Sequence, residues 1–137
     1  MSRRALIAGS LCLAVLLGGC SLGKKTASTG SFTGAKANIA VTLNALASDS
    51  NSGDETGICT SGLDSAVVAK LRRVGTCTQI IKDQLKTVDN FTLTIKSIAV
   101  TGATAKARVQ TKHNGQLKTQ TVVLRREQAG WRIDSVL

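Results

Sequence analysis

The most reactive side chains of this sequence are four cysteines and a single histidine, and their spacing argues against the usual sites. Cys59 and Cys77, with the distant His113, supply too few ligands for a structural zinc ion, so we expect no metal. The two cysteines are also too far apart for a typical redox-active pair. His113 directly precedes Asn114-Gly115, a dipeptide typical of hairpin turns. We therefore expect it at a solvated hairpin tip, away from any pocket and not as a general base, and we expect no cofactor.

Cys20 lies where its thiol is expected to be modified. It ends the sequence Leu17-Gly18-Gly19-Cys20, which follows Arg3-Arg4 and an apolar run over Ala5–Leu17. A run of about 13 residues suits a signal peptide and is shorter than the roughly 20 residues that span a membrane. The motif resembles a bacterial lipobox, which implies cleavage between Gly19 and Cys20 and acylation of Cys20. An uncleaved anchor and an ordinary secretory cleavage site are the alternatives.

This reading places the protein at the outer face of the cytoplasmic membrane, in the cell envelope. Acylated Cys20 would hold it in the membrane lipid, since two acyl chains give the lasting attachment that one chain does not. Ser2-Arg3-Arg4-Ala5-Leu6 partly resembles a twin-arginine export motif, so the export route stays open between that pathway and the general secretory one. The expected organisation is a lipoprotein signal peptide over 1–19, a lipidated cysteine with a flexible tether over 20–34, and a single domain over 35–137.

Cys59 and Cys77 are expected to form a disulfide. They remain as an even pair once Cys12 leaves with the signal peptide and Cys20 takes the lipid. Disulfides form and persist in oxidising compartments such as the one that export would reach. The loop of about 19 residues that the bond closes corresponds to about 3 kcal/mol in the chain-entropy account.

The charge balance is strongly basic. Without Arg3 and Arg4 the chain keeps 16 basic residues against 8 acidic ones, a formal net charge of +8. Such a balance favours anionic partners: phospholipid headgroups, an anionic envelope polymer or an acidic protein. Nucleic acid is not expected, because the exported part has only three aromatic residues, too few for a platform on which bases stack.

Three of the cations are candidates for binding an anionic surface. Lys106, Arg108 and Lys112 alternate along one predicted strand and therefore share a face of the sheet. An ordinary solvated face is the alternative. Three further cations could extend this stripe: Lys96, Lys118 and Arg126.

The first half of the domain is predicted to be helical. From Ala35 one apolar face recurs at helical spacing until small polar residues interrupt it over 49–53. The members of that face are Ile39, Ala40, Leu43, Leu46 and Ala47. A short helical turn over 54–61 would carry Cys59. Asp64 is expected to cap a helix that ends at Gly75, and Thr76 a helix that starts at Cys77.

After Lys86 the apolar period changes to two, which indicates strands. The first strand, from Phe91, loses its alternation at Ser97–Ile98, which predicts a bulge. Expected turns at 101–102, 114–115 and 128–130 separate four strands, the third over about 117–126 and the last over 131–137. Helices followed by an antiparallel meander define an α+β fold, with N-terminal helices packed on a curved four-stranded antiparallel sheet.

This order of elements resembles the nuclear transport factor 2-like superfamily. The most specific part is the closing hairpin, Leu124-Arg125-Arg126-Glu127 followed by Trp131-Arg132-Ile133-Asp134. More narrowly, the chain is similar to small actinobacterial lipoproteins that carry this domain, over Ala35–Leu137. The resemblance implies a sheet wrapped around a long helix, a cone that often opens into a pocket. The superfamily includes isomerases and dehydratases as well as non-enzymatic binding domains, so the fold alone does not give the function.

The residues favour the non-enzymatic class. Enzymatic relatives place an Asp or His with a Tyr or a second acid inside the cone, and this chain has no Tyr. Asp134 is expected to pair with an Arg of the third strand, and Trp131 to close the core. We therefore expect a membrane-anchored binding or accessory domain, with a small isomerase, dehydratase or hydrolase as the alternative. A ligand carrier is a variant that an apolar, enclosed cavity would support, whereas the ligand, the partner and the oligomeric state are not set by the sequence.

Overall fold

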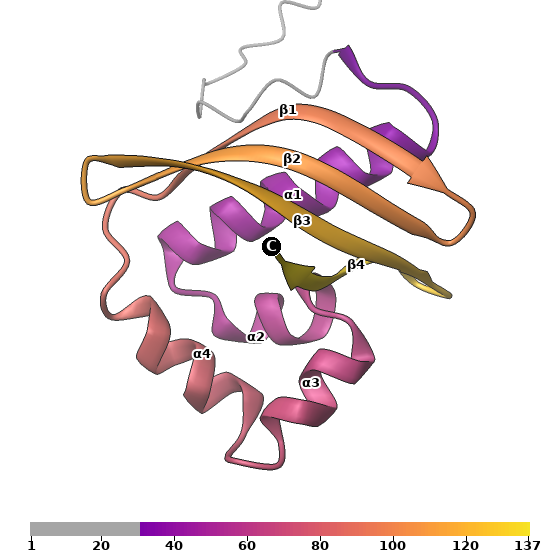
Figure 1. Ribbon diagram of the computed structural model, residues 1–137. Helices are drawn as coiled ribbons and strands as arrows, with labels where there is room; N and C mark the ends of the chain where they lie inside the picture. Colours follow the sequence, from indigo (N-terminus) through magenta and orange to yellow (C-terminus); the bar gives the residue numbers. More distant parts are fainter. Residues whose placement is uncertain (1–30) are drawn as a thin grey trace, which may run out of the picture.

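The computed structural model describes residues 31–137, in which helices cover one face of a sheet (Figure 1). The sheet is antiparallel, in the order β1-β2-β3-β4, and curves over the long helix α1. The strands are β1 (Thr92–Thr101), β2 (Thr104–His113), β3 (Gln116–Glu127) and β4 (Gly130–Val136). The helical elements are α1 (Ala35–Ser52), α2 (Glu55–Gly57), the π-helical turn η2 (Ile58–Gly62), α3 (Ser65–Leu71) and α4 (Cys77–Leu85). The expected α+β class is confirmed.

Helix α1 buries the predicted apolar face. Ile39, Ala40 and Leu43 are fully buried under the sheet. The expected break over 49–53 is wrong, because the helix continues to Ser52 and ends at Gly53, whose φ of 70° is left-handed. A tertiary contact holds this last turn: the Asn51 side-chain amide donates to Phe91 O at 2.7 Å and accepts from Phe91 N at 2.9 Å.

The shorter helices begin at the predicted caps. The Asp64 carboxylate accepts from Val67 N at 2.7 Å, and the Thr76 hydroxyl accepts from Gln79 N at 3.3 Å. Asp64 N also donates to Ile133 O at 2.9 Å, so the segment before α3 lies along the free edge of β4. Helix α3 ends at Leu71, four residues before the expected Gly75, and a turn follows it.

The sheet follows the predicted strand periods closely. The bulge falls between Ile95 and Ser97, slightly earlier than expected. Asn114 (φ 49°) and Gly115 (φ 77°) both adopt left-handed conformations, as a tight hairpin turn requires, and they set the β2–β3 register. On β2, buried and exposed residues alternate strictly over 104–109. The face of the sheet that packs on the helices is called the inner face below, and the opposite one the outer face.

The core lies between α1 and the inner face. Leu124, Val109 and Trp131 fill it from the sheet, and Trp131 is only 4% exposed, so its predicted place in the core is confirmed. On the outer side of the closing hairpin, Arg125 Nε lies 3.1 Å from Asp134 Oδ1. This is the ion pair that the sequence predicts between Asp134 and the third strand.

Candidate functional site

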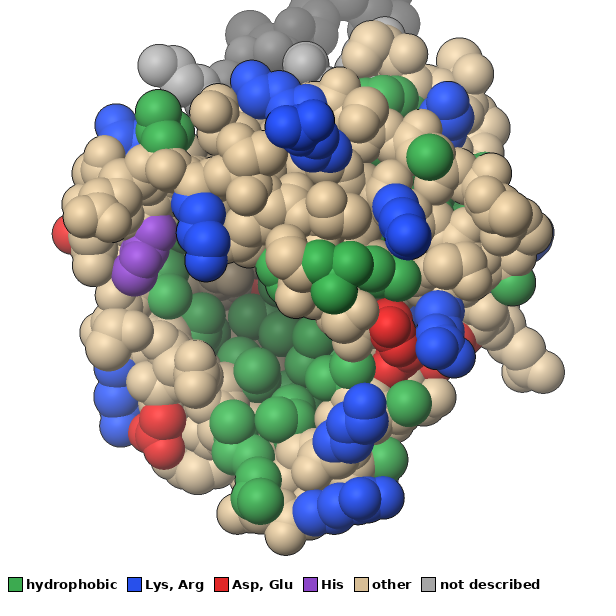
Figure 2. All heavy atoms as spheres, viewed as in Figure 1, with side chains coloured by type: hydrophobic (Ala, Val, Ile, Leu, Met, Phe, Trp, Pro, Cys, Tyr) green, Lys and Arg blue, Asp and Glu red, His purple; other side chains and the backbone are tan. Residues whose placement is uncertain are grey.

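A cavity of about 410 Å³ opens between the inner face of the sheet and the C-terminal half of α1. Figure 2 shows hydrophobic side chains gathered in the hollow below the sheet. Leu46 contributes from α1, and Val88 and Phe91 from the segment that joins α4 to the sheet. The strands add four apolar side chains: Leu93, Val109, Val122 and Val136. The volume falls at the lower end of the range usual for small-molecule sites.

The polar side chains of this cavity come from one place, the end of the β2–β3 hairpin. Thr111 and His113 of β2 pair with Lys118 and Gln116 of β3, and Gln120 follows on the same face. Side chains that share a face recur at every second residue along a strand, so the hairpin places these five together. The inner face is therefore apolar at its centre and polar towards the hairpin tip.

His113 lies at the edge of this cavity and not in open solvent, so the expectation that it is a solvated turn residue away from any pocket is wrong. Its side chain is partly buried, and Nε2 lies 2.9 Å from the carbonyl oxygen of Thr87. A carbonyl oxygen only accepts hydrogen bonds, so Nε2 carries the proton and donates. The hairpin tip curls over the segment between α4 and β1, a tertiary contact that the local sequence of the turn does not encode.

Lys118 also occupies a different place from the one expected. It pairs with Thr111, whose side chain is buried, and so lies on the inner face among the cavity-lining residues. Within the described residues, the cavity lining includes no Asp or Glu. Among residues 31–137, Lys118 is consequently the one lysine in this lining, and His113 the one imidazole.

The predicted basic face is present on the outer side of the sheet. Lys106, Arg108 and Lys112 are all exposed, on alternate positions of β2, and we call these three residues the basic face. Within residues 31–137 the ion pairs are Lys86–Asp83 and Arg125–Asp134, so no carboxylate neutralises these three cations. The flanking residues on the neighbouring strands are mostly hydroxyl-bearing: Ser97, Thr92, Thr94, Thr119 and Thr121.

The proposed extension of this stripe is only partly right. Lys96 is exposed in β1, at the bulge. Lys118 and Arg126 are not part of it, because their strand partners are the inner-face residues Thr111 and Trp131. The period of two holds within β2, and the Asn114-Gly115 turn fixes the faces of β3 by pairing Thr111 with Lys118.

A second hollow of about 680 Å³ lies where α1 begins, against the turn between β3 and β4. Its acidic residue, Glu127, accepts hydrogen bonds from the backbone N of Ser65 at 2.9 Å and from its hydroxyl at 2.8 Å. These bonds favour the ionised carboxylate and hold the pKa of Glu127 below its ordinary value. Glu127 thus ties this turn to the start of α3.

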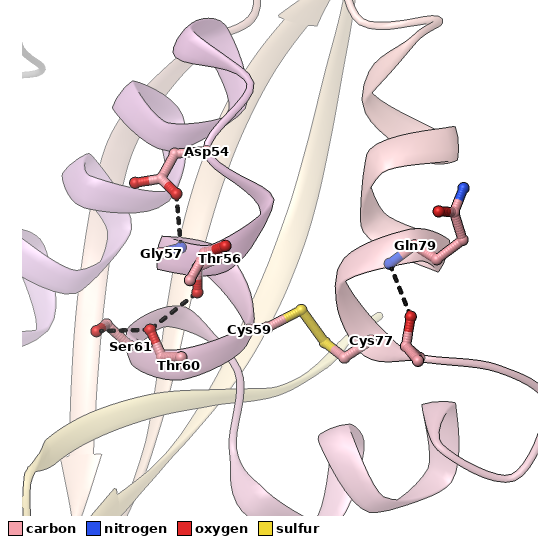
Figure 3. Close-up of a disulfide and its surroundings, with 9 residues drawn as sticks. Asp54, Thr56, Gly57, Cys59, Thr60, Ser61, Cys77 and Gln79 are labelled. Carbon is pink, nitrogen blue, oxygen red and sulfur yellow. Dashed lines mark hydrogen bonds between the residues drawn. A yellow bond between two sulfur atoms is a disulfide. The ribbon is translucent and has the colours of Figure 1, made fainter.

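The predicted disulfide between Cys59 and Cys77 is confirmed, with the Cα atoms 6.1 Å apart (Figure 3). It joins the buried π-helical turn η2 to the first residue of α4. The Asp54 side chain caps the preceding turn by accepting from Gly57 N at 2.8 Å. The bond therefore fixes α4, and through it the chain that leads into the cavity-lining Val88 and Phe91.

The signal peptide, the acylated Cys20 and most of the tether lie outside the described residues and stay predictions. None of the helices in the described part is long and apolar enough to cross a membrane. Across residues 31–137, no group of three or more His, Cys, Asp or Glu side chains could hold a metal ion. No protein-family model, curated protein or solved structure matches this chain. The superfamily resemblance thus also stays a prediction.

Proposed function

We propose that this protein is a lipid-anchored binding domain of the cell envelope that holds an apolar ligand in a cone of the nuclear transport factor 2-like kind. The observation that carries the proposal is the 410 Å³ cavity, with seven apolar side chains in its lining and polar groups at one end only. Ligand sites generally combine a mostly apolar lining with a few polar groups that fix orientation. The curved sheet over α1 supports the cone, and the sequence before residue 31 supports the anchor.

The binding of an uncharged apolar probe tests this function directly. All the helices and strands that surround the core lie within residues 35–137. A chain over 20–137 with Cys20→Ser therefore retains the described fold. The fluorescence of N-phenyl-1-naphthylamine rises in apolar surroundings, and titration of this chain should give saturable binding of one probe per chain.

A pair of valine variants shows whether the probe occupies the cavity. Val88 lines it and is partly buried, so Val88→Trp should fill the space and weaken binding about tenfold or more. Val74 is 83% exposed and outside the cavity, so Val74→Trp is the matched control and should bind as the parent does. Absence of saturable binding, or equal loss in both variants, would contradict the proposal.

The enzyme alternative depends on His113, the one imidazole at the cavity. An acid–base pair of the kind the superfamily's enzymes use needs a second partner, and the lining supplies Lys118 but no carboxylate. Turnover of a small carbonyl or ester compound that is abolished by His113→Gln, while probe binding is retained, would favour the alternative over a binding domain.

A further inference from the structure

We infer that the ligand of this cavity is a single-chain amphiphile whose head is anionic, a carboxylate or a phosphate monoester, held at the hairpin end by Lys118. The inference rests on the proposed function, because it names the class of ligand for the same cavity. It is carried by the position of the polar and charged side chains along β2 and β3.

The direction of the ligand follows from the strand register. Val109 and Val122 are buried at the centre of the inner face, whereas Thr111, Gln116 and Lys118 follow towards the hairpin tip. An apolar chain gains most where it leaves water for apolar surroundings, and a charged head loses least where water still reaches it. The tail should therefore lie against the valines and the head beside the exposed end of the hairpin.

The sign of the head follows from the charges that line the cavity. Lys118 is exposed, and its four-carbon stem lets the ammonium group reach a head at the cavity mouth. The lining that residues 31–137 provide has no side-chain carboxylate to pair with a cationic head or to compete for Lys118. His113 donates Nε2–H to Thr87 O, so this nitrogen is already engaged. An anion is therefore the head that these side chains favour, and a quaternary ammonium the one that they oppose.

The size of the cavity favours one chain over two. A volume of about 410 Å³ is near the lower limit for small-molecule sites, and the two alkyl chains of a bulky diacyl lipid need more room than one. Fatty acids and alkyl phosphates share the required chemistry, a single apolar chain with an anionic head.

Four ligands with the same twelve-carbon chain separate the head from the tail: dodecanoate, dodecyl phosphate, dodecanol and dodecyltrimethylammonium. We would measure their affinities for the chain over 20–137 with Cys20→Ser, each below its micelle concentration, by displacement of the uncharged probe. At least one of the two anions should bind about tenfold or more tightly than the alcohol, because hydrogen bonds to charged groups are worth more than neutral ones. The cation should bind most weakly.

Two lysine variants with equal net charge test the role of Lys118. Lys118→Gln should lower the affinity for the preferred anion about tenfold and leave dodecanol unchanged. Lys36→Gln removes the same charge from the exposed start of α1, outside the cavity lining, and should leave all four affinities near those of the parent. Melting temperatures of both variants check that the fold is intact.

The results test two claims separately: that the ligand has an anionic head, and that the cavity binds an apolar ligand at all. Preference for dodecanoate or for dodecyl phosphate supports the inference and says which anion the site takes. Equal affinity for the alcohol and both anions, or equal effects of the two lysine variants, overturns the anionic head while the apolar cavity stands. Failure of every ligand and of the uncharged probe to bind overturns the proposed function itself.

Discussion

His113 and Thr87, 26 positions apart in the sequence, are joined by a hydrogen bond of 2.9 Å from Nε2 of the imidazole to the backbone carbonyl oxygen. The bond ties the tip of the β2–β3 hairpin to the segment that follows α4. Both segments contribute residues to the mouth of the cavity, His113 and Gln116 from one and Val88 and Phe91 from the other. The bond therefore joins two of the segments that line this mouth.

Removing this bond should increase local opening at the cavity mouth while lowering the overall stability of the fold only slightly. His113→Ala should lower the free energy of unfolding by about 1 kcal/mol, the usual net value of one such hydrogen bond. Amide hydrogen exchange should become faster over residues 87–91 in particular. His113→Gln offers an amide N–H in place of the imidazole and should restore part of the protection. Unchanged exchange in the alanine variant would show that the bond does not hold the two segments together.

The disulfide should contribute substantially to stability. Cys59 and Cys77 are separated by 18 positions, and closing a loop of this size stabilises the fold by about 3 kcal/mol in the chain-entropy account. The double variant Cys59→Ala/Cys77→Ala should therefore have a free energy of unfolding that is lower by about this amount. It should unfold at a correspondingly lower urea concentration. A reducing agent should shift the parent towards the double variant and leave the variant itself unchanged. A parent whose unfolding curve does not respond to reduction would contradict this account.

Glu127 should make the fold sensitive to acid. Its hydrogen bonds from Ser65 lower the pKa in the folded state, so the unfolded state binds a proton first as the pH falls. The stabilising contribution is fully present above the ordinary pKa of 4.5 and is lost as the pH falls through that value towards the lowered folded one.

The variant Glu127→Gln isolates this contribution. Its amide oxygen can still accept from Ser65, but a neutral acceptor binds more weakly than a carboxylate. At pH 7 the parent should be the more stable of the two, and urea unfolding should show that difference shrinking as the pH is lowered below 4.5. A difference that stays constant from neutral to acid pH would mean that the carboxylate charge plays no part.

Cys20 should be the first residue of the mature protein and carry the lipid. In Cys20→Ser the thiol that would be acylated is gone, so the protein should stay unprocessed or leave the membrane fraction. Intact mass and membrane fractionation of cells making each form measure this. Cys12→Ser is the control, because that cysteine lies inside the expected signal peptide and should not matter. Identical mass and fractionation of parent and Cys20→Ser would remove the basis for the anchor.

Local patterns predicted most of the elements. The helical face of Ile39 and Leu43, the caps at Asp64 and Thr76, and the Asn114-Gly115 turn are each set by a few neighbouring residues, and all three predictions are confirmed. The end of α1 was not predictable in this way. The polar residues near its end are poor at continuing a helix, yet the two hydrogen bonds between Asn51 and Phe91, 40 positions apart, hold the last turn.

The cavity was the least predictable feature, because α1, the segment after α4 and the hairpin each supply part of it. One part of it was within reach of the sequence. A two-residue turn at 114–115 pairs residue 111 with 118, so the alternation of β2 already places Lys118 on the inner face. The position of His113 against Thr87 depends instead on how the hairpin curves over the helices, which no local period encodes.

The basic face should bind anionic surfaces through charge alone. Lys106, Arg108 and Lys112 are exposed on one strand, and no carboxylate in the described part of the chain pairs with them. Screening acts over about 8 Å at physiological salt, so only close approach to a surface counts. The affinity of the unlipidated chain for vesicles that contain phosphatidylglycerol should therefore fall steeply between low and moderate salt. Replacing all three residues of the basic face by Gln should weaken binding at low salt and flatten this salt dependence. A triple change at Lys70, Arg72 and Arg73, exposed near the end of α3, removes the same charge elsewhere and should have a smaller effect. If the two triple variants lose binding equally, overall charge and not the basic face drives the attraction, and if neither loses it, the face is only a solvated surface.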